Sequence, residues 1–129
     1  MPTLQLQFPS KSVYVGVARL AVAGVARATG FDEDTVFDLK TAVSEALAAA
    51  VLHGEETGDE TPIALAWEDR EDGVVIEVRH AGGLPEPGSD VDAVDTQAMS
   101  VALLRALVDE SEFVSEDDGS TTIRLKIAR

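Results

Sequence analysis

Two consecutive segments with helical periodicity, set behind a short strand pattern, restrict this chain to a small set of folds. Apolar residues recur at helical spacing from 13 to 30 and again from 32 to 54, with a glycine at the end of each segment. Residues 4–8 read LQLQF and alternate as a half-buried strand does. The first half of the chain therefore predicts one strand followed by a pair of helices.

Residue types at the ends of these segments support the predicted boundaries. Ser10 or Ser12 can cap the first helix after Pro9 breaks the strand. Asp32 or Asp34 can cap the second helix, because a side-chain oxygen there accepts a hydrogen bond from a free backbone N–H. Within the first helix the repeat is formed by Val17, Leu20, Gly24 and Ala28.

The second half of the chain predicts strands at 63–67 and 74–79, a helix at 96–108 and a closing hairpin that turns at 117–119. Blocks of strands alternating with helices favour one sheet covered on one face by helices. The predicted fold is an α/β two-layer sandwich with a mixed, largely antiparallel sheet. With no linker or repeat, residues 1–129 are expected to form a single domain.

Composition and charge exclude several classes of function. The formal net charge is −14 and no cluster of basic residues occurs, so direct binding of nucleic acid is not expected. The chain contains no cysteine, which removes thiolate metal sites and cysteine nucleophiles. The N-terminus does not resemble a secretory signal, and no uncharged apolar run is long enough to span a bilayer. We therefore expect a cytoplasmic protein without a membrane partner.

Glu45 stands out in the alanine-rich second helix. At 100° per residue it lies nearly opposite the predicted packing stripe. That stripe consists of Val36, Leu39, Val43, Ala46 and Ala50. Periodicity alone leaves two interpretations open, a solvated glutamate and a general base at the edge of a cleft. His53, at the predicted helix end, is more typical of a hydrogen-bonded cap than of a ligand.

Longer stretches of the sequence resemble one known family. YVGVARLAVAGVARATGF, DLKTAVSEALAAAVLHG, LLRALVDESEF and DDGSTTIRLKIAR are similar, in matching order, to the anti-sigma factor serine kinases of the RsbW type. These belong to the GHKL (Bergerat, or histidine kinase-like) ATPase superfamily, whose ATP-binding fold is a two-layer α/β sandwich. The resemblance covers almost the whole chain and implies the same fold.

The resemblance also implies partners and functional residues. Members of this family bind a sigma factor and dimerise. They phosphorylate a serine of an anti-anti-sigma partner, a STAS-domain protein, using ATP and magnesium. Glu45 corresponds to the glutamate proposed as base in that reaction. Arg19 corresponds to an arginine of the first helix that contacts both protein partners.

Four parts of the family's nucleotide site depart from its pattern. Ala49 stands where an asparagine holds magnesium, and a methyl group cannot ligate a hard cation. His80 replaces the aspartate that reads adenine, and the segment that begins at Gly82 keeps only part of the glycine pattern. Ala98 to Ser100 replace a Gly-x-Gly cradle for phosphate. The segment between, 82–97, is acidic and holds no lysine or arginine.

These departures lead to one main expectation and two alternatives. The main expectation is an anti-sigma factor-like regulator that binds a sigma factor or STAS partner, with no cofactor and no metal site. The first alternative is an active serine kinase that uses ATP and magnesium with Glu45 as base. The second is a reused cleft for another small ligand, lined by His80, Leu84 and Met99.

Overall fold

A computed structural model describes residues 3–81 and 102–128 and confirms the predicted order of elements. Residues 102–107 are helical and lead directly into the last hairpin. The other elements are β1 (Thr3–Phe8), α1 (Val13–Ala28), α2 (Glu33–Thr57), β2 (Ile63–Arg70), β3 (Gly73–His80), β4 (Glu110–Ser115) and β5 (Thr121–Ala128).

The five strands form one sheet in the order β1-β2-β3-β5-β4. Every described pairing is antiparallel, so the predicted mixed sheet is wrong in that detail. The reason lies in the connections. Two successive helices carry the chain away from β1 and back again, so β2 enters the sheet opposite in direction to β1, and short turns join β2 to β3 and β4 to β5.

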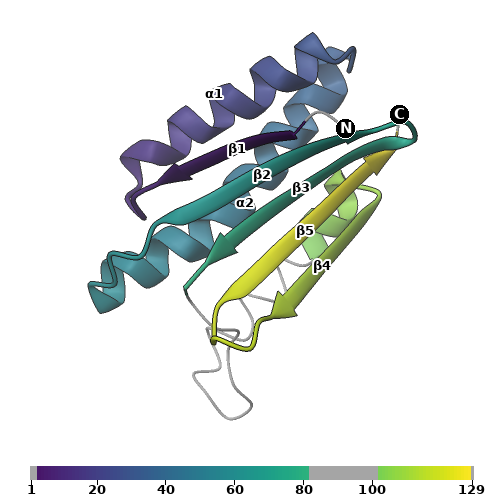
Figure 1. Ribbon diagram of the computed structural model, residues 1–129. Coiled ribbons are helices and arrows are strands. Elements are labelled where there is room, and N and C mark those ends of the chain that lie inside the picture. The colour runs from purple at the N-terminus through teal and green to yellow at the C-terminus, as the bar shows by residue number, and fades with distance from the viewer. Residues whose placement is uncertain (1–2, 82–101, 129) are drawn as a thin grey trace.

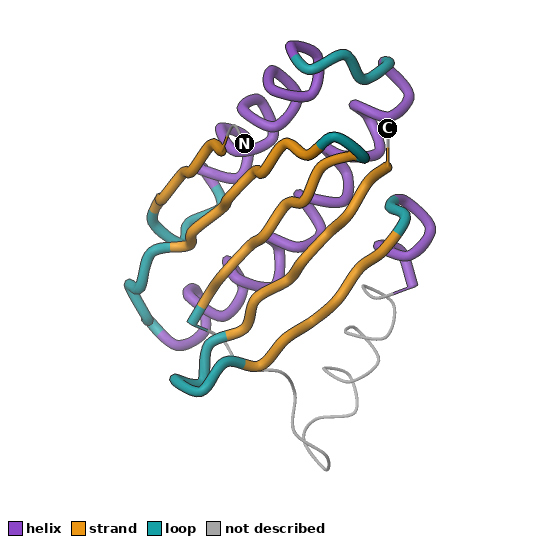
Figure 2. Tube along the Cα trace, turned by 45° about the vertical axis from the view of Figure 1, so that its right-hand side comes forward, coloured by secondary structure: helices purple, strands orange, loops and turns teal. Residues whose placement is uncertain are grey.

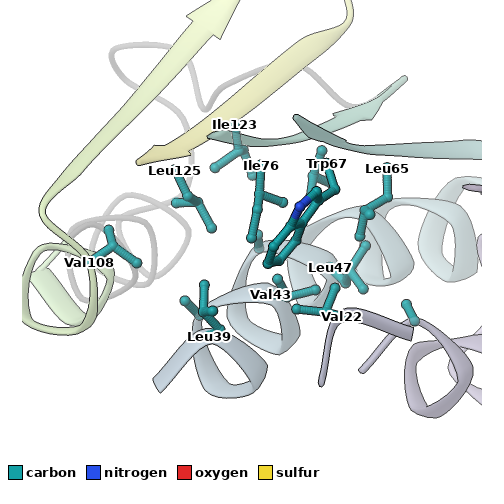
Figure 3. Packing of buried hydrophobic residues seen from close by; sticks show 14 of the residues in the cluster. Val22, Leu39, Val43, Leu47, Leu65, Trp67, Ile76, Val108, Ile123 and Leu125 are labelled. Carbon is teal, nitrogen blue, oxygen red and sulfur yellow. The ribbon is translucent and has the colours of Figure 1, made fainter. Parts of the chain in front are cut away.

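The helices lie on one face of this sheet, which confirms the two-layer α/β sandwich (Figures 1 and 2). Figure 3 shows apolar side chains of the strands and of the helices meeting between the layers. Trp67 of β2 is the largest of them and is 2% exposed. Its ring meets the ring of Phe31 edge to face, with the ring centroids 6.4 Å apart.

Helix α1 buries a different face from the one that its apolar repeat would suggest. Val17 and Leu20, two members of that repeat, are 59% and 73% exposed. The buried side chains of α1 are mostly small, which lets α1 lie close against α2. They are Ala18, Val22, Ala23 and Ala26.

Helix α2 begins as predicted but ends four residues later than expected. Asp32 caps it by accepting a hydrogen bond from the Thr35 backbone N–H at 2.8 Å. The helix continues through Gly54 and ends at Gly58, whose φ of 72° is left-handed. Gly54 instead serves close packing, because a Cβ atom there would collide with the side chain and carbonyl of Ser10.

The other face of the sheet carries no helix among the described residues (Figure 1). Its charged side chains pair across the strands. The Arg124 guanidinium lies 3.0 Å from the Glu77 carboxylate and 3.7 Å from that of Glu112. Lys126 Nζ lies 3.5 Å from Glu110 Oε2. This face is therefore close to neutral in a strongly acidic chain.

Candidate functional site

Glu45 lies in the middle of α2 and is partly exposed, as expected for a residue away from the core stripe. All five residues of the predicted stripe are buried, and Ala42, Leu47 and Val51 widen it. Ala49 follows one turn later in the same helix, and its side chain lies outside what the structure describes. Glu45 therefore keeps access to solvent, and no described hydrogen bond fixes its carboxylate.

The two histidines of the chain are brought together by the fold. His80 ends β3 on the helix-facing side, is 8% exposed and pairs in register with Thr121 of β5. Burial lowers the pKa of His80, and the positive charge of protonated His53 on α2 lowers it further. His53 Nε2 lies 3.3 Å from Asp59 Oδ2. Glu45 stands about 12 Å along the helix axis from His53 and does not join this group.

The lowered pKa of His80 predicts a loss of stability in mild acid. The ordinary pKa of a histidine is about 6.5. As pH falls through this value, residue His80 binds a proton in the unfolded chain but not in the folded chain, where burial lowers its pKa. The free energy of unfolding then falls, by at most about 1.4 kcal/mol per pH unit for one group, until His80 itself is protonated. Replacement His80→Gln should flatten this decline in urea titrations between pH 7.5 and 5.5.

His53→Gln is the matched control, because it removes the other histidine but leaves the buried one. In this variant most of the decline should remain. Carboxylates whose pKa is lowered, such as Asp59 and Asp118, lose their stabilising contacts only at lower pH and do not contribute in this range. An unchanged decline in His80→Gln would contradict the assignment.

Arg19 lies on α1 and is exposed. Within residues 3–81 and 102–128 no ion pair or hydrogen bond of its side chain is found, and the same holds for Lys11 just before the helix. Arg27, further along α1, differs because its guanidinium holds the Glu33 carboxylate at 2.8 Å. Within the part of the chain that the structure describes, the side chains of Arg19 and Lys11 thus have no charged partner.

Several residues of the predicted nucleotide site lie outside the described residues. They are Gly82, Leu84, Ala98, Met99 and Ser100. In the part of the chain that is described, no group of three or more histidine, aspartate or glutamate side chains is arranged to hold a metal ion. None of the described helices is long and apolar enough to cross a membrane.

Comparison with known families decides how this arrangement is classified. The histidine kinase-like ATPase domain matches residues 8–127, which is nearly the whole chain. The chain belongs to this family. The predicted GHKL-type fold and the resemblance to the RsbW type are thereby confirmed.

Curated relatives carry the name serine-protein kinase RsbW. One from Listeria monocytogenes serotype 4a is 30% identical over 135 residues, covering 95% of this chain and 85% of the relative. Another, from Oceanobacillus iheyensis, is 31% identical over 119 residues and covers 83% and 75% of the two chains.

Two solved structures share the fold. The RsbU and RsbW domains of a Mycobacterium tuberculosis protein match with a TM-score of 0.77 and 22% identity over 99% of this chain, which spans 32% of that longer chain. The SiaB–SiaC complex of Pseudomonas aeruginosa matches with a TM-score of 0.67 and 15% identity, covering 96% of this chain and 88% of the other.

Proposed function

We propose that the chain is an anti-sigma factor-like regulator that binds its protein partners without transferring phosphate. The family match extends over 8–127, yet Ala49 and His80 occupy positions to which the resemblance to the RsbW-type kinases assigns nucleotide-binding residues. This contrast is the observation on which the proposal rests. Control would then come from exchange between a sigma factor and a STAS partner, not from phosphorylation.

The residues at the nucleotide positions do not fit ATP and magnesium. Magnesium requires oxygen ligands, and Ala49 has none to offer. His80 is buried, and its neutral imidazole offers a single acceptor nitrogen where the resemblance places a carboxylate with two acceptor oxygens. The acidic composition of 82–97 would repel three phosphates.

The names of the relatives favour one alternative, an active serine kinase. In that case Glu45 would accept the proton of the substrate serine, and ATP with magnesium would supply the phosphoryl group. Glu45 is partly exposed and could be reached by a substrate. The two proposals differ in one measurable property, the transfer of phosphate to a STAS protein.

We further propose that Arg19 contacts the protein partners and that the regulator is a homodimer. The uncovered sheet face suits a second copy, because its charges are already paired and two acidic chains can approach there with little repulsion. A shallow hollow on this face, beside β1, is lined in part by the small side chains of Ala64 and Ala66. Sedimentation equilibrium tests this assembly: the wild type should be a dimer, and Ala66→Arg, which places a large charged side chain on this face, should dissociate it. A monomeric wild type would refute the homodimer.

The functional proposal is tested with purified sigma factors and STAS proteins encoded in the same genome. Calorimetric titration should show binding of at least one of them without nucleotide. Incubation with ATP and magnesium should leave the STAS protein without added phosphate by mass spectrometry. Phosphate transfer that disappears in Glu45→Ala would establish the kinase instead, and no binding of any candidate would refute the regulator.

A further inference from the structure

Helix α2 turns one face away from the core, and this face carries large apolar side chains in solvent. Phe37 and Leu52 are 65% and 50% exposed. They lie about 60° apart around the helix and about 22 Å apart along its axis. Large apolar side chains exposed along one helix face are typical of an interaction surface. This face, called the α2 outer face below, consists of Phe37, Thr41, Ser44, Ala48 and Leu52.

The two hydroxyl groups of the α2 outer face are satisfied within the helix itself. Thr41 Oγ1 donates a hydrogen bond to the Phe37 carbonyl at 3.0 Å. Ser44 Oγ donates one to the Lys40 carbonyl at 2.8 Å. Neither side chain therefore needs a polar partner from outside. The α2 outer face can thus be covered by apolar side chains along about four turns, a length that one amphipathic helix can span.

Carboxylates border the α2 outer face along one side. At 100° per residue all four lie between about 60° and 100° from Phe37, in the same direction around the helix. They are Asp34, Asp38, Glu45 and Glu56. Across the described residues, the side chains of these four make no ion pair or hydrogen bond. Lys40 is the only lysine or arginine in the sequence of α2 and does not balance them.

These carboxylates determine which kind of molecule can cover the α2 outer face. Nucleic acid would bring phosphates against them. A second copy of the chain would bring an equally acidic α2, with Lys40 as its only strongly basic residue. A protein helix with lysine or arginine beside its apolar face would pair with the carboxylates instead. Complementarity of charge therefore favours a basic amphipathic helix.

We propose that the α2 outer face is a docking site for an amphipathic helix of another protein, with lysine or arginine residues along one border of its apolar face. The apolar side chains of this helix would cover Phe37 and Leu52, and its cations would pair with Asp38 and Glu45. Glu45 then has a role in binding, on an element separate from α1. The inference goes beyond the proposed function, because it does not require the partner to be a sigma factor or a STAS protein.

The experiment is calorimetric titration of the purified chain with a synthetic peptide of leucine and lysine, about 18 residues long, whose leucines form one face of a helix. This peptide should bind the wild type, and a peptide with glutamate at every lysine position should not. Phe37→Ser should lower the affinity about 10-fold without a change in Tm, because the side chain is exposed and serine has a similar helix propensity. Asp38→Asn should lower it about 3-fold, because it removes one exposed ion pair.

Two variants elsewhere on the surface are matched controls. Leu20→Ser changes a leucine that is 73% exposed on α1, a helix without carboxylates, and Asp117→Asn removes an exposed carboxylate from the turn between β4 and β5. Both should bind the leucine–lysine peptide as the wild type does.

Three results would overturn the inference. The first is a wild type that does not bind the leucine–lysine peptide. The second is an equal effect of each variant and its control, because the peptide would then be held by net charge or by apolar surface in general. The third is a wild-type dimer that dissociates in Phe37→Ser by sedimentation equilibrium, because a second copy would then be the occupant of the α2 outer face.

Discussion

Arg19→Glu is expected to lower affinity for the sigma factor or STAS partner at least about 30-fold while the protein stays fully folded. An arginine at the centre of an interface is worth about 2 kcal/mol or more, which corresponds to that factor. Reversing its charge also places a carboxylate where the partner surface would receive a cation. The fold itself should tolerate the change, because Arg19 is exposed and makes no described contact.

Arg105→Glu provides the control for the change in net charge. Arg105 is also exposed and precedes β4 in the sequence, and β4 lies at the edge of the sheet opposite β1 and away from α1 (Figure 1). Both variants change the net charge equally, so a general electrostatic effect would weaken binding in both. Titration calorimetry with circular dichroism melts separates affinity from stability. If Arg19→Glu and the wild type bind the partner with equal affinity, Arg19 is not part of the partner surface.

Trp67→Ala is expected to be the most damaging core substitution, with a loss of about 3–5 kcal/mol in the free energy of unfolding. The ring is 2% exposed and lies on β2, with Leu4 and Ile76 as its partners on the neighbouring strands. Its removal opens a cavity between sheet and helices and also ends the contact with Phe31. Such a loss approaches the total stability of many domains.

Trp67→Phe should lower the free energy of unfolding much less than Trp67→Ala, because it keeps an aromatic ring and removes no described hydrogen bond. Among the described residues Trp67 Nε1 has no hydrogen-bond partner. Urea unfolding should be followed by circular dichroism, since this is the single tryptophan of the chain and its fluorescence is lost in both variants. Equal losses in the two variants would mean that the indole N–H, not the ring volume, matters at this position.

The sequence predicts the elements well because periodicity and caps are local properties. The Asp32 cap, the β2–β3 turn and the closing hairpin all occur where residue types indicate them. The predicted end of α2 at Gly54 was wrong because this glycine is required by close packing against Ser10, a tertiary contact that no local sequence pattern encodes. The antiparallel pairing of β1 follows from the connections and becomes visible only once the sheet order is known.

For the candidate sites, too, the sequence predicts local properties but not contacts between different elements. Helical spacing identifies α1 but does not show which side is buried when alanine, valine and leucine occur all around it, so the exposure of Leu20 emerges only from the packing on α2. The partial exposure of Glu45 was predictable from the helical wheel. The approach of His53 to His80 joins residues from two elements and could not be derived from spacing. The roles of Glu45 and Arg19 stay predictions.

Calorimetric titration of the purified chain with ATP and with ADP, both with magnesium, tests the central claim most directly. We predict no binding heat at millimolar nucleotide, because Ala49 and His80 supply neither a magnesium ligand nor a carboxylate for adenine. Binding with a micromolar Kd would contradict this account, and Glu45 would then have to be examined as the base of a working kinase.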